Sequence, residues 1–414
     1  MPELLIRPGE NDHGVIGDLL TPAAGAILLP GARPLIDRLV LDAHVAAARP
    51  EFAETAREVG LPVLIDPLTL FWQGVLREKD KWSKLPFGDA RKLSPEELSN
   101  DFRREQLVAA TVDFQIDNGA TAIIPAYTYA SSPGDPFFQI SLDFLRATSR
   151  YMGRNGIALP IIPIFCAQLQ SFGPEKSWRE GIDRFASVAL DLGPEAIGVC
   201  LSPAGNLKDD SYNKVFRLFA ATRRLKKTGT RIFAWRQGIY GPGLVAAGID
   251  GYETGIGTRE QAQLARAIGS RKPPKPGKKS GGGGGPGIYL EPLRRSVSSK
   301  VGETLLGDRS MRPKVMCDDE RCCPNGAGST LDQRRHHAVR SRSRELAAIE
   351  SQPHMTWRLH QIQKDTRAAA DLAVQANEVL KQAKIKERIG TPGYEALAGV
   401  MEFLLASAED VEAA

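Results

Sequence analysis

Three of the five cysteines in this 414-residue chain fall within seven residues, at Cys317, Cys322 and Cys323. Three thiolates and one histidine make a common tetrahedral Zn²⁺ site, so the spacing predicts a zinc-binding segment. From the residues alone, the fourth ligand could be His337, His354 or His360. One of the two adjacent cysteines could be idle, because neighbours in sequence do not easily bind one ion. The alternative is a loop with unligated cysteines.

Polar residues also follow several short apolar runs, where a parallel barrel carries its reactive groups. Asp66 follows residues 63–65, and Glu253 follows Gly251-Tyr252. Two carboxylates from different strands would face one mouth, and such a pair suits chemistry at a sugar anomeric carbon. The alternative is that each carboxylate pairs with a nearby arginine. Other polar residues in such positions are Tyr127, Thr128, Tyr129, Gln168, Trp235, Arg236 and Gln237.

A glycine-rich turn, Gly255-Ile256-Gly257-Thr258-Arg259, follows the last of these runs. Glycines let backbone amides approach an anion, so the turn is a candidate phosphate cradle at a helix start. An ordinary strand-to-helix turn is the alternative.

The elements that would position these residues alternate between strand and helix. Apolar runs rich in Ile and Val are typical of strands buried on both faces. They lie at residues 26–29, 38–41, 62–65, 122–125, 161–165, 196–200, 231–235 and 251–254. Helical patterns lie at 95–118, 137–154, 176–192, 208–226 and 259–268. This alternation predicts an α/β fold, a (β/α)8 TIM barrel, with a doubly wound sheet as the alternative.

The remaining sequence predicts a second, mostly helical part. We expect the barrel catalytic domain at 1–270 and a flexible Lys/Pro/Gly linker at 271–287, where five glycines follow Ser280. A zinc-binding lobe would occupy 288–386, and a C-terminal helix with an acidic tail 387–414. Hydrophobic residues make up 42% of the chain, which is enough to bury a normal core.

Charge is unevenly distributed, although the net charge is only +5. Basic runs at 271–279 and 334–344 are typical of nucleic-acid binding, with solvated surfaces as the alternative. The first residues lack a signal-peptide pattern, and no apolar run approaches the length of a membrane span. We therefore expect a soluble, cytoplasmic protein with no membrane partner.

Several motifs, in this order, resemble the tRNA-guanine transglycosylase family (queuine or archaeosine tRNA-ribosyltransferases). They are Leu64–Gln73, Leu93–Glu96, Gly119–Ile124, Leu244–Glu253, Gly257–Arg259 and the cysteine cluster followed by Leu359-His360-Gln361. The resemblance covers residues 55–375. The chain departs from the family at Pro67–Phe71 and in its Cys-x4-Cys-Cys spacing. Glu253 also replaces the family's aspartate nucleophile.

The resemblance implies a base-exchange transglycosylase that replaces guanine, or a related base, with a 7-deazaguanine derivative in tRNA or DNA. It assigns catalysis to Asp66 and Glu253, base contacts to Gln168 and Thr128, and Zn²⁺ to Cys317, Cys322, Cys323 and His360. It further implies queuosine or DNA modification, a nucleic acid held by the 334–344 helix, and a homodimer. The alternatives are a phosphate-binding barrel enzyme acting on a small molecule and a catalytically inactive nucleic-acid-binding barrel.

Overall fold

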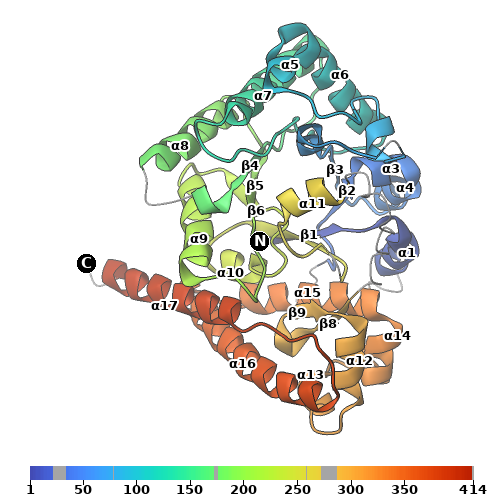
Figure 1. Ribbon diagram of the computed structural model, residues 1–414, viewed down its shortest axis with the longest axis vertical. Coiled ribbons are helices and arrows are strands. Elements are labelled where there is room, and N and C mark those ends of the chain that lie inside the picture. The colour runs from blue at the N-terminus through green and yellow to red at the C-terminus, as the bar shows by residue number, and fades with distance from the viewer. Residues whose placement is uncertain (22–33, 78, 172–175, 258, 272–286, 413–414) are drawn as a thin grey trace.

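A curled parallel sheet forms the centre of the protein (Figure 1). The computed structural model describes all residues except 22–33, 78, 172–175, 258, 272–286 and 413–414. Within this part, seven strands pair in the order β3-β2-β1-β7-β6-β5-β4. The strands are β1 (Glu3–Arg7), β2 (Arg38–Asp42), β3 (Val63–Asp66), β4 (Ile164–Gln168), β5 (Ala196–Ser202), β6 (Arg231–Ala234) and β7 (Gly251–Gly255).

A short segment joins the two edges of this sheet. Ala122 forms a parallel bridge with Leu64 of β3, and Ile123 forms one with Ile161, just before β4. The edges therefore meet through residues 122 and 123, and the sheet takes a barrel-like form. The predicted α/β architecture is confirmed at this level: a curled parallel sheet with helices around it.

Strand β1 occupies the middle of the sheet, between β2 and β7. Its residues Leu4, Leu5 and Ile6 are fully buried, as expected for a strand covered on both faces. The sequence analysis missed this strand, and it placed the first strand at 26–29, which lies outside the described residues. The other predicted strands correspond to β2 through β7, with residues 122 and 123 in isolated bridges.

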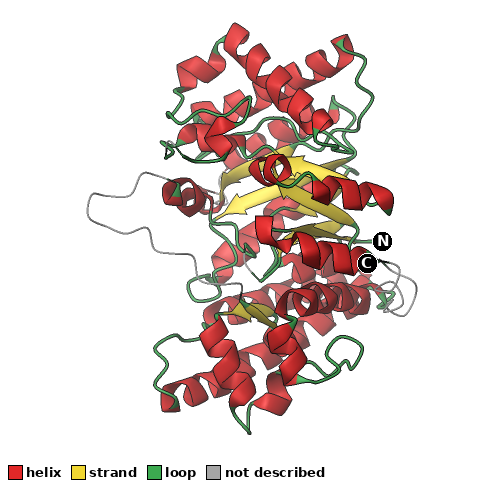
Figure 2. Cartoon of the chain, turned by 90° about the vertical axis from the view of Figure 1, so that its right-hand side faces the viewer, coloured by secondary structure: helices red, strands yellow, loops and turns green. Residues whose placement is uncertain are grey.

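Helices surround the sheet and connect its strands (Figures 1 and 2). They are α1 (His13–Leu20), α3 (Ala43–Ala48), α4 (Glu51–Glu58), α5 (Pro95–Ser99), α6 (Asp101–Asp117), α7 (Pro136–Arg154), α8 (Lys176–Leu190), α9 (Tyr212–Lys226), α10 (Gly241–Ala246) and α11 (Leu264–Ser270). The expected single helix at 95–118 is two helices. Ser94 caps α5 in a capping box with Glu97, and Asn100 then accepts a bond from the Arg103 amide to start α6.

The C-terminal part is mostly helical and packs below the sheet in Figure 1. It contains a two-stranded antiparallel ribbon, β8 (Ile288–Leu290) with β9 (Arg295–Val297). Its helices are α12 (Ser299–Gly307), α13 (Arg312–Val315), α14 (Ala327–Asp332), α15 (Arg334–Glu350), α16 (Met355–Gln382) and α17 (Pro392–Glu412). The predicted domain boundaries stay a prediction, and most of the expected linker lies outside the described residues.

Helix α15 lies between the two parts and contacts both β1 and β8. Its arginines bond to the protein itself: Arg342 donates to the Gly238 carbonyl at 2.5 Å and to Glu260 at 3.0 Å. Arg335 pairs with Asp12 at 3.1 Å. These bonds place the basic run of 334–344 within the fold, and Arg342 is buried. Among the described helices, none is long and apolar enough to cross a membrane.

Because β1 and β7 pair closely, we expect that adding one methyl group at Gly251 strongly affects the free energy of unfolding. A Cβ at Gly251 would lie 2.6 Å from the Glu3 carbonyl oxygen. We expect Gly251→Ala to lower the free energy of unfolding by about 1–3 kcal/mol, because the backbones must separate. Gly153→Ala is the matched control: it lies in α7 with open space around it, and it should stabilise by up to about 1 kcal/mol. Urea unfolding measures both, and equal effects would contradict the close approach.

Candidate functional site

The carboxyl end of the sheet holds a buried network of charges centred on Arg7. Its Nε donates to Glu253 Oε1 at 2.8 Å, and one terminal nitrogen donates to Asp66 Oδ2 at 2.8 Å and Glu253 Oε2 at 3.1 Å. The other terminal nitrogen pairs with Asp42. Arg7, Asp66 and Glu253 are fully buried. One guanidinium therefore joins the carboxylates of β2, β3 and β7.

Arg7 must stay charged for this arrangement to exist. Burial opposes its charge, but the carboxylates of Glu253, Asp66 and Asp42 outweigh burial and raise the pKa of Arg7 well above its usual value. The pKa of Asp42 moves the other way. Burial would raise the pKa of Asp42. The neighbouring guanidiniums, of which Arg259 has the largest effect, instead hold this pKa well below its usual value.

Asp66 accepts bonds on both of its oxygens. Oδ1 accepts from the Tyr127 hydroxyl at 2.8 Å and from the Leu68 amide at 3.0 Å. Oδ2 accepts from Arg7 and from the Trp235 indole nitrogen at 3.1 Å. Burial, and then the charge of Asp66, raises the pKa of Tyr127 well above its usual value. The phenol therefore stays protonated and donates to Asp66.

Two further arginines form the outer side of the network. Arg259 bonds to Asp42 at 2.6 Å and its side chain is 35% exposed, while Arg236 lies 3.4 Å from Asp42 and is 11% exposed. Exposure thus falls from these guanidiniums to Asp42 at 4% and then to Arg7 at 0%. The most exposed groups of the network are therefore the two positively charged arginines.

Arg236 has one unused hydrogen-bond donor. Its Nε is buried and has no hydrogen-bond partner in the part of the chain that the structure describes. Arg236 nevertheless stays charged. Burial and the positive charge of Arg7 act to lower its pKa, but the carboxylates of Asp42, Glu253 and Asp66 together raise the pKa of Arg236. A buried guanidinium with an unused donor is a candidate for binding an anion.

The backbone around the network is strained. Leu68, Arg236 and Arg259 have φ of 52°, 56° and 60°, in the left-handed region that side chains with a Cβ rarely adopt. They follow β3, β6 and β7, the strands that end at the network. Strained residues of this kind concentrate at functional sites.

The structure brings together only part of the predicted site. Asp66 and Glu253 do meet, through Arg7. Gln168 lies at the end of β4, half-buried, and donates to Gln170 at 3.1 Å. The side chain of Thr128 is buried against α7, where the hydroxyl donates to the Phe137 carbonyl at 2.6 Å.

The Gly255–Arg259 turn does not form the expected cradle at a helix start. Helix α11 begins only at Leu264. Gly257 instead packs against Gly287, whose amide donates to the Gly257 carbonyl at 3.0 Å. A Cβ at Gly257 would lie 2.7 Å from the Gly287 carbonyl oxygen. The glycine therefore allows a close contact between two backbones.

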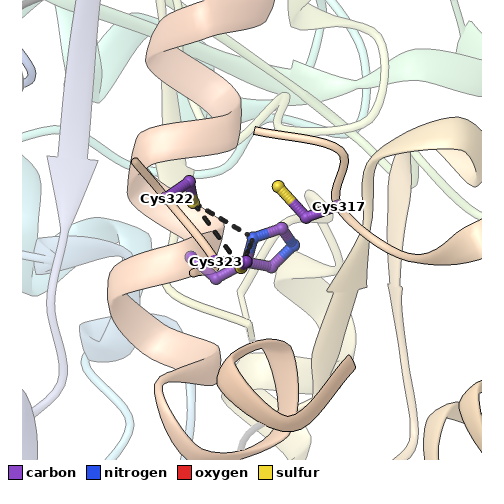
Figure 3. Close-up of side chains that lie close together, drawn as sticks. Cys317, Cys322 and Cys323 are labelled. Atoms are coloured by element: carbon purple, nitrogen blue, oxygen red, sulfur yellow. Dashed lines mark hydrogen bonds between the residues drawn. The ribbon is translucent and has the colours of Figure 1, made fainter. Parts of the chain in front are cut away.

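A second cluster lies in the C-terminal part and contains Cys317, Cys322, Cys323 and His337. Their ligand atoms lie within 4.8 Å of one another, and all four residues are buried. Figure 3 shows the three cysteine side chains close together. Both adjacent cysteines take part, because the sulfur of each lies 3.4 Å from His337 Nδ1. The Asp319 carbonyl accepts both of their amides, so a tight turn brings the two side chains to one point.

His337 has the orientation of a metal ligand. Its Nε2 lies 3.0 Å from the Tyr289 carbonyl, which leaves Nδ1 toward the sulfurs. His360, the predicted fourth ligand, is exposed on α16 and is not among the clustered residues. His354 is exposed and stacks edge-on against Trp357. The set of three sulfurs and one imidazole nitrogen fits Zn²⁺.

Comparisons with known proteins do not support the transglycosylase resemblance. No protein-family model matches the sequence, and no curated protein matches it. Similar solved structures include a 2,3-dimethylmalate lyase of the PEP mutase/isocitrate lyase superfamily (11% identity, 65% of this chain, 79% of that chain, TM-score 0.33). A second is the CutC protein of Streptococcus agalactiae, with 14% identity over 61% of this chain and 98% of that chain and a TM-score of 0.33. A third is the carboxyl transferase domain of Rhizobium etli pyruvate carboxylase with 3-bromopyruvate, with 12% identity over 98% of this chain and 61% of that chain and a TM-score of 0.36.

These likenesses are too weak to carry an argument about function. The family prediction is wrong because no family model matches the chain, that of the transglycosylases included. The three structures named above are a lyase, CutC and a carboxyl transferase. The predicted base exchange, with its queuosine and DNA modification, is therefore wrong. The physical reason is that each motif was short. Apolar strands ending in a carboxylate recur in many parallel barrels, so their order is weak support for one family.

The depressed pKa of Asp42 gives a pH-dependent prediction. A carboxylate whose folded pKa is lowered stabilises the fold above its unfolded pKa of about 3.9 and loses that effect as the pH falls. At pH 7 we expect Asp42→Asn to cost about 3–5 kcal/mol, because it removes one partner of buried arginines. Below pH 4 the difference in the free energy of unfolding between variant and wild type should shrink by about 1.4 kcal/mol per pH unit.

Urea unfolding between pH 3 and pH 7 measures this gap. Asp101→Asn is the control, since Asp101 pairs with Arg104 on the surface and should cost less than about 1 kcal/mol at any pH. A gap for Asp42→Asn that is independent of pH would contradict the assigned ionisation.

Proposed function

We propose that the protein is an enzyme that binds a small anionic molecule, a carboxylate or a phosphate, at the carboxyl end of its sheet. The observation that carries this proposal is Arg236, a charged and mostly buried guanidinium with an unused Nε donor. Arg259 adds a second cation on the solvent side. Both belong to strained backbone at the ends of β6 and β7.

The proposal includes a (β/α)8 barrel, with residues 122 and 123 in the position of an eighth strand. The bridges of Ala122 and Ile123 to the two sheet edges support it. Active sites of such barrels lie at the carboxyl ends of the strands. Arg7, Asp42, Asp66 and Glu253 all lie at that end, so the network occupies the expected place.

Each residue then has a distinct part in the site. Arg236 and Arg259 hold the anionic group, and Arg7 fixes the positions of the carboxylates. Asp66, which also accepts the Tyr127 hydroxyl bond, and Glu253 are fully buried and hold Arg7 in place behind the two outer arginines. Tyr127 keeps its proton and is a hydrogen-bond donor to Asp66.

Anion binding can be tested without knowing the natural substrate. Orthophosphate and malonate are titrated while thermal unfolding is followed, and a ligand at ten times its Kd should stabilise by about 1.4 kcal/mol. We expect Arg236→Gln to remove this stabilisation. Arg236→Lys keeps the charge but lacks the planar donor fork, so it should weaken binding about tenfold or more.

Arg146→Gln is the matched control, because Arg146 is an exposed α7 residue that pairs with Asp143. It should retain the full stabilisation. The proposal fails if neither anion stabilises the wild type, or if a folded Arg236→Lys variant binds as tightly as the wild type.

We further propose that Cys317, Cys322, Cys323 and His337 bind Zn²⁺. Four protein ligands fill a tetrahedral ion, which is typical of a structural site. When bound, the ion would stabilise the folded C-terminal part, since metal binding and folding are coupled. The chain's own contribution is the orientation of His337 by the Tyr289 carbonyl and a bond from the Thr330 hydroxyl to Cys323 Sγ at 3.4 Å.

Metal content after gel filtration tests the zinc site directly. We expect one zinc per chain in the wild type and in His360→Ala, and a loss of zinc in His337→Ala and Cys322→Ser. Chelation should lower the unfolding temperature of the wild type but leave that of a metal-free variant unchanged. Zinc lost in His360→Ala and kept in His337→Ala would contradict this ligand set.

A further inference from the structure

A groove lies on the outer helices, away from the network and from the cysteine cluster. It is lined by residues of α8, α9 and α17, which lie side by side in Figure 1. Helix α9 contacts both neighbours. The cavity measures 650 Å³, within the range typical of ligand sites. Neither the sequence motifs nor the proposed reaction uses this groove.

The floor of the groove is apolar and aromatic. Ile182, Phe219 and Leu404 form its buried part. Phe216 packs edge-on against Phe403 at 5.1 Å, and Phe403 is 45% exposed. An exposed apolar surface that is rimmed by polar residues is typical of an interaction site or a ligand groove.

The rim of the groove is positively charged. Five basic residues and no acidic residue are among those that line it: Arg179, Arg217, Arg223, Arg224 and Lys227. Arg224 pairs with Asp183 at 2.7 Å, and Arg217 donates to the Gln170 carbonyl at 3.1 Å. Arg179, Arg223 and Lys227 are exposed and have no ion-pair partner within the described residues. Three cations are thus left for a ligand.

The spread of these cations decides what kind of ligand fits. From Arg217 to Lys227 the chain advances ten residues, which is about 15 Å along a helix. Arg179 adds charge from α8, on the other wall. The single head group of a fatty acid could neutralise only one end of this rim. A ligand with carboxylates repeated along its length and an apolar face between them matches both rim and floor.

We propose that this groove binds an acidic amphipathic helix of a partner protein. The apolar face of that helix covers Phe216 and Phe403, and its carboxylates pair with Arg179, Arg223 and Lys227. Helices bind grooves in this way through apolar residues spaced at i, i+3, i+4 and i+7. Aromatic residues and arginines are also the residue types that contribute most to protein interfaces.

A synthetic helix of about four turns provides the probe. It carries Leu at the i, i+3, i+4 and i+7 positions, Glu on the other face, and a fluorescein label. We expect it to bind the full chain in fluorescence anisotropy, more weakly as salt rises because the pairs are exposed. The double variant Arg223→Glu/Lys227→Glu should weaken binding about tenfold or more, and Phe403→Ser should do the same.

Control experiments distinguish an acidic helix from a fatty acid and from a second copy of this chain in the groove. Lys300→Glu/Arg309→Glu makes the same charge change at exposed positions of the C-terminal part and should leave binding unchanged. A peptide of the same composition in scrambled order should bind at least tenfold more weakly. Three results would each overturn the proposal: no binding of the helix, equal binding of the scrambled peptide, or complete displacement of the helix by oleate. Dimerisation of the chain through Phe403, seen by light scattering and lost in Phe403→Ser, would also overturn it.

Discussion

The burial of one charge, that of Arg7, sets the arrangement at the carboxyl end of the sheet. A guanidinium taken out of water costs several kcal/mol unless it is paired on every side. Asp42, Asp66 and Glu253 supply that pairing, and they come from β2, β3 and β7, which are the neighbours of β1 or next to them. The four charged groups therefore add to the backbone pairing of these strands, and losing one of them leaves the others buried with fewer partners.

This constraint explains why the outer residues are strained. Three carboxylates around one guanidinium leave an excess of negative charge, which Arg236 and Arg259 balance. To reach Asp42 from the ends of β6 and β7, both arginines adopt positive φ. Such backbone is costly, and it persists where the surroundings hold it. The same positive φ places both guanidiniums on Asp42, on the outer side of the network, which is the basis of the proposed anion site.

Sequence patterns predicted the strand ends but not the group that joins them. Asp66 was identified because it follows the apolar run 63–65, and Glu253 because it follows Gly251-Tyr252. Arg7 was missed, since Leu4-Leu5-Ile6 is too short a run to be recognised beside the prolines at positions 2 and 8. The nucleic-acid contact predicted for the basic run of 334–344 stays a prediction, because composition gives the sign of a charge and not its partner. His337 could not be chosen over His360 by spacing alone, since the choice depends on how α15 packs against the cysteine turn.

Helix α15 connects the two clusters. His337 contacts Cys322 and Cys323, and Arg342, just over one turn later, bonds to the Gly238 carbonyl and to Glu260. Gly238 lies two residues after Arg236, and Glu260 directly follows Arg259. The helix thus ties the backbone beside both outward arginines to the cysteine cluster. Because a buried arginine cannot lose its partners without a large cost, a shift of α15 at the cluster would have to move Gly238 and Glu260 as well. The C-terminal part therefore helps to hold the proposed anion site in shape.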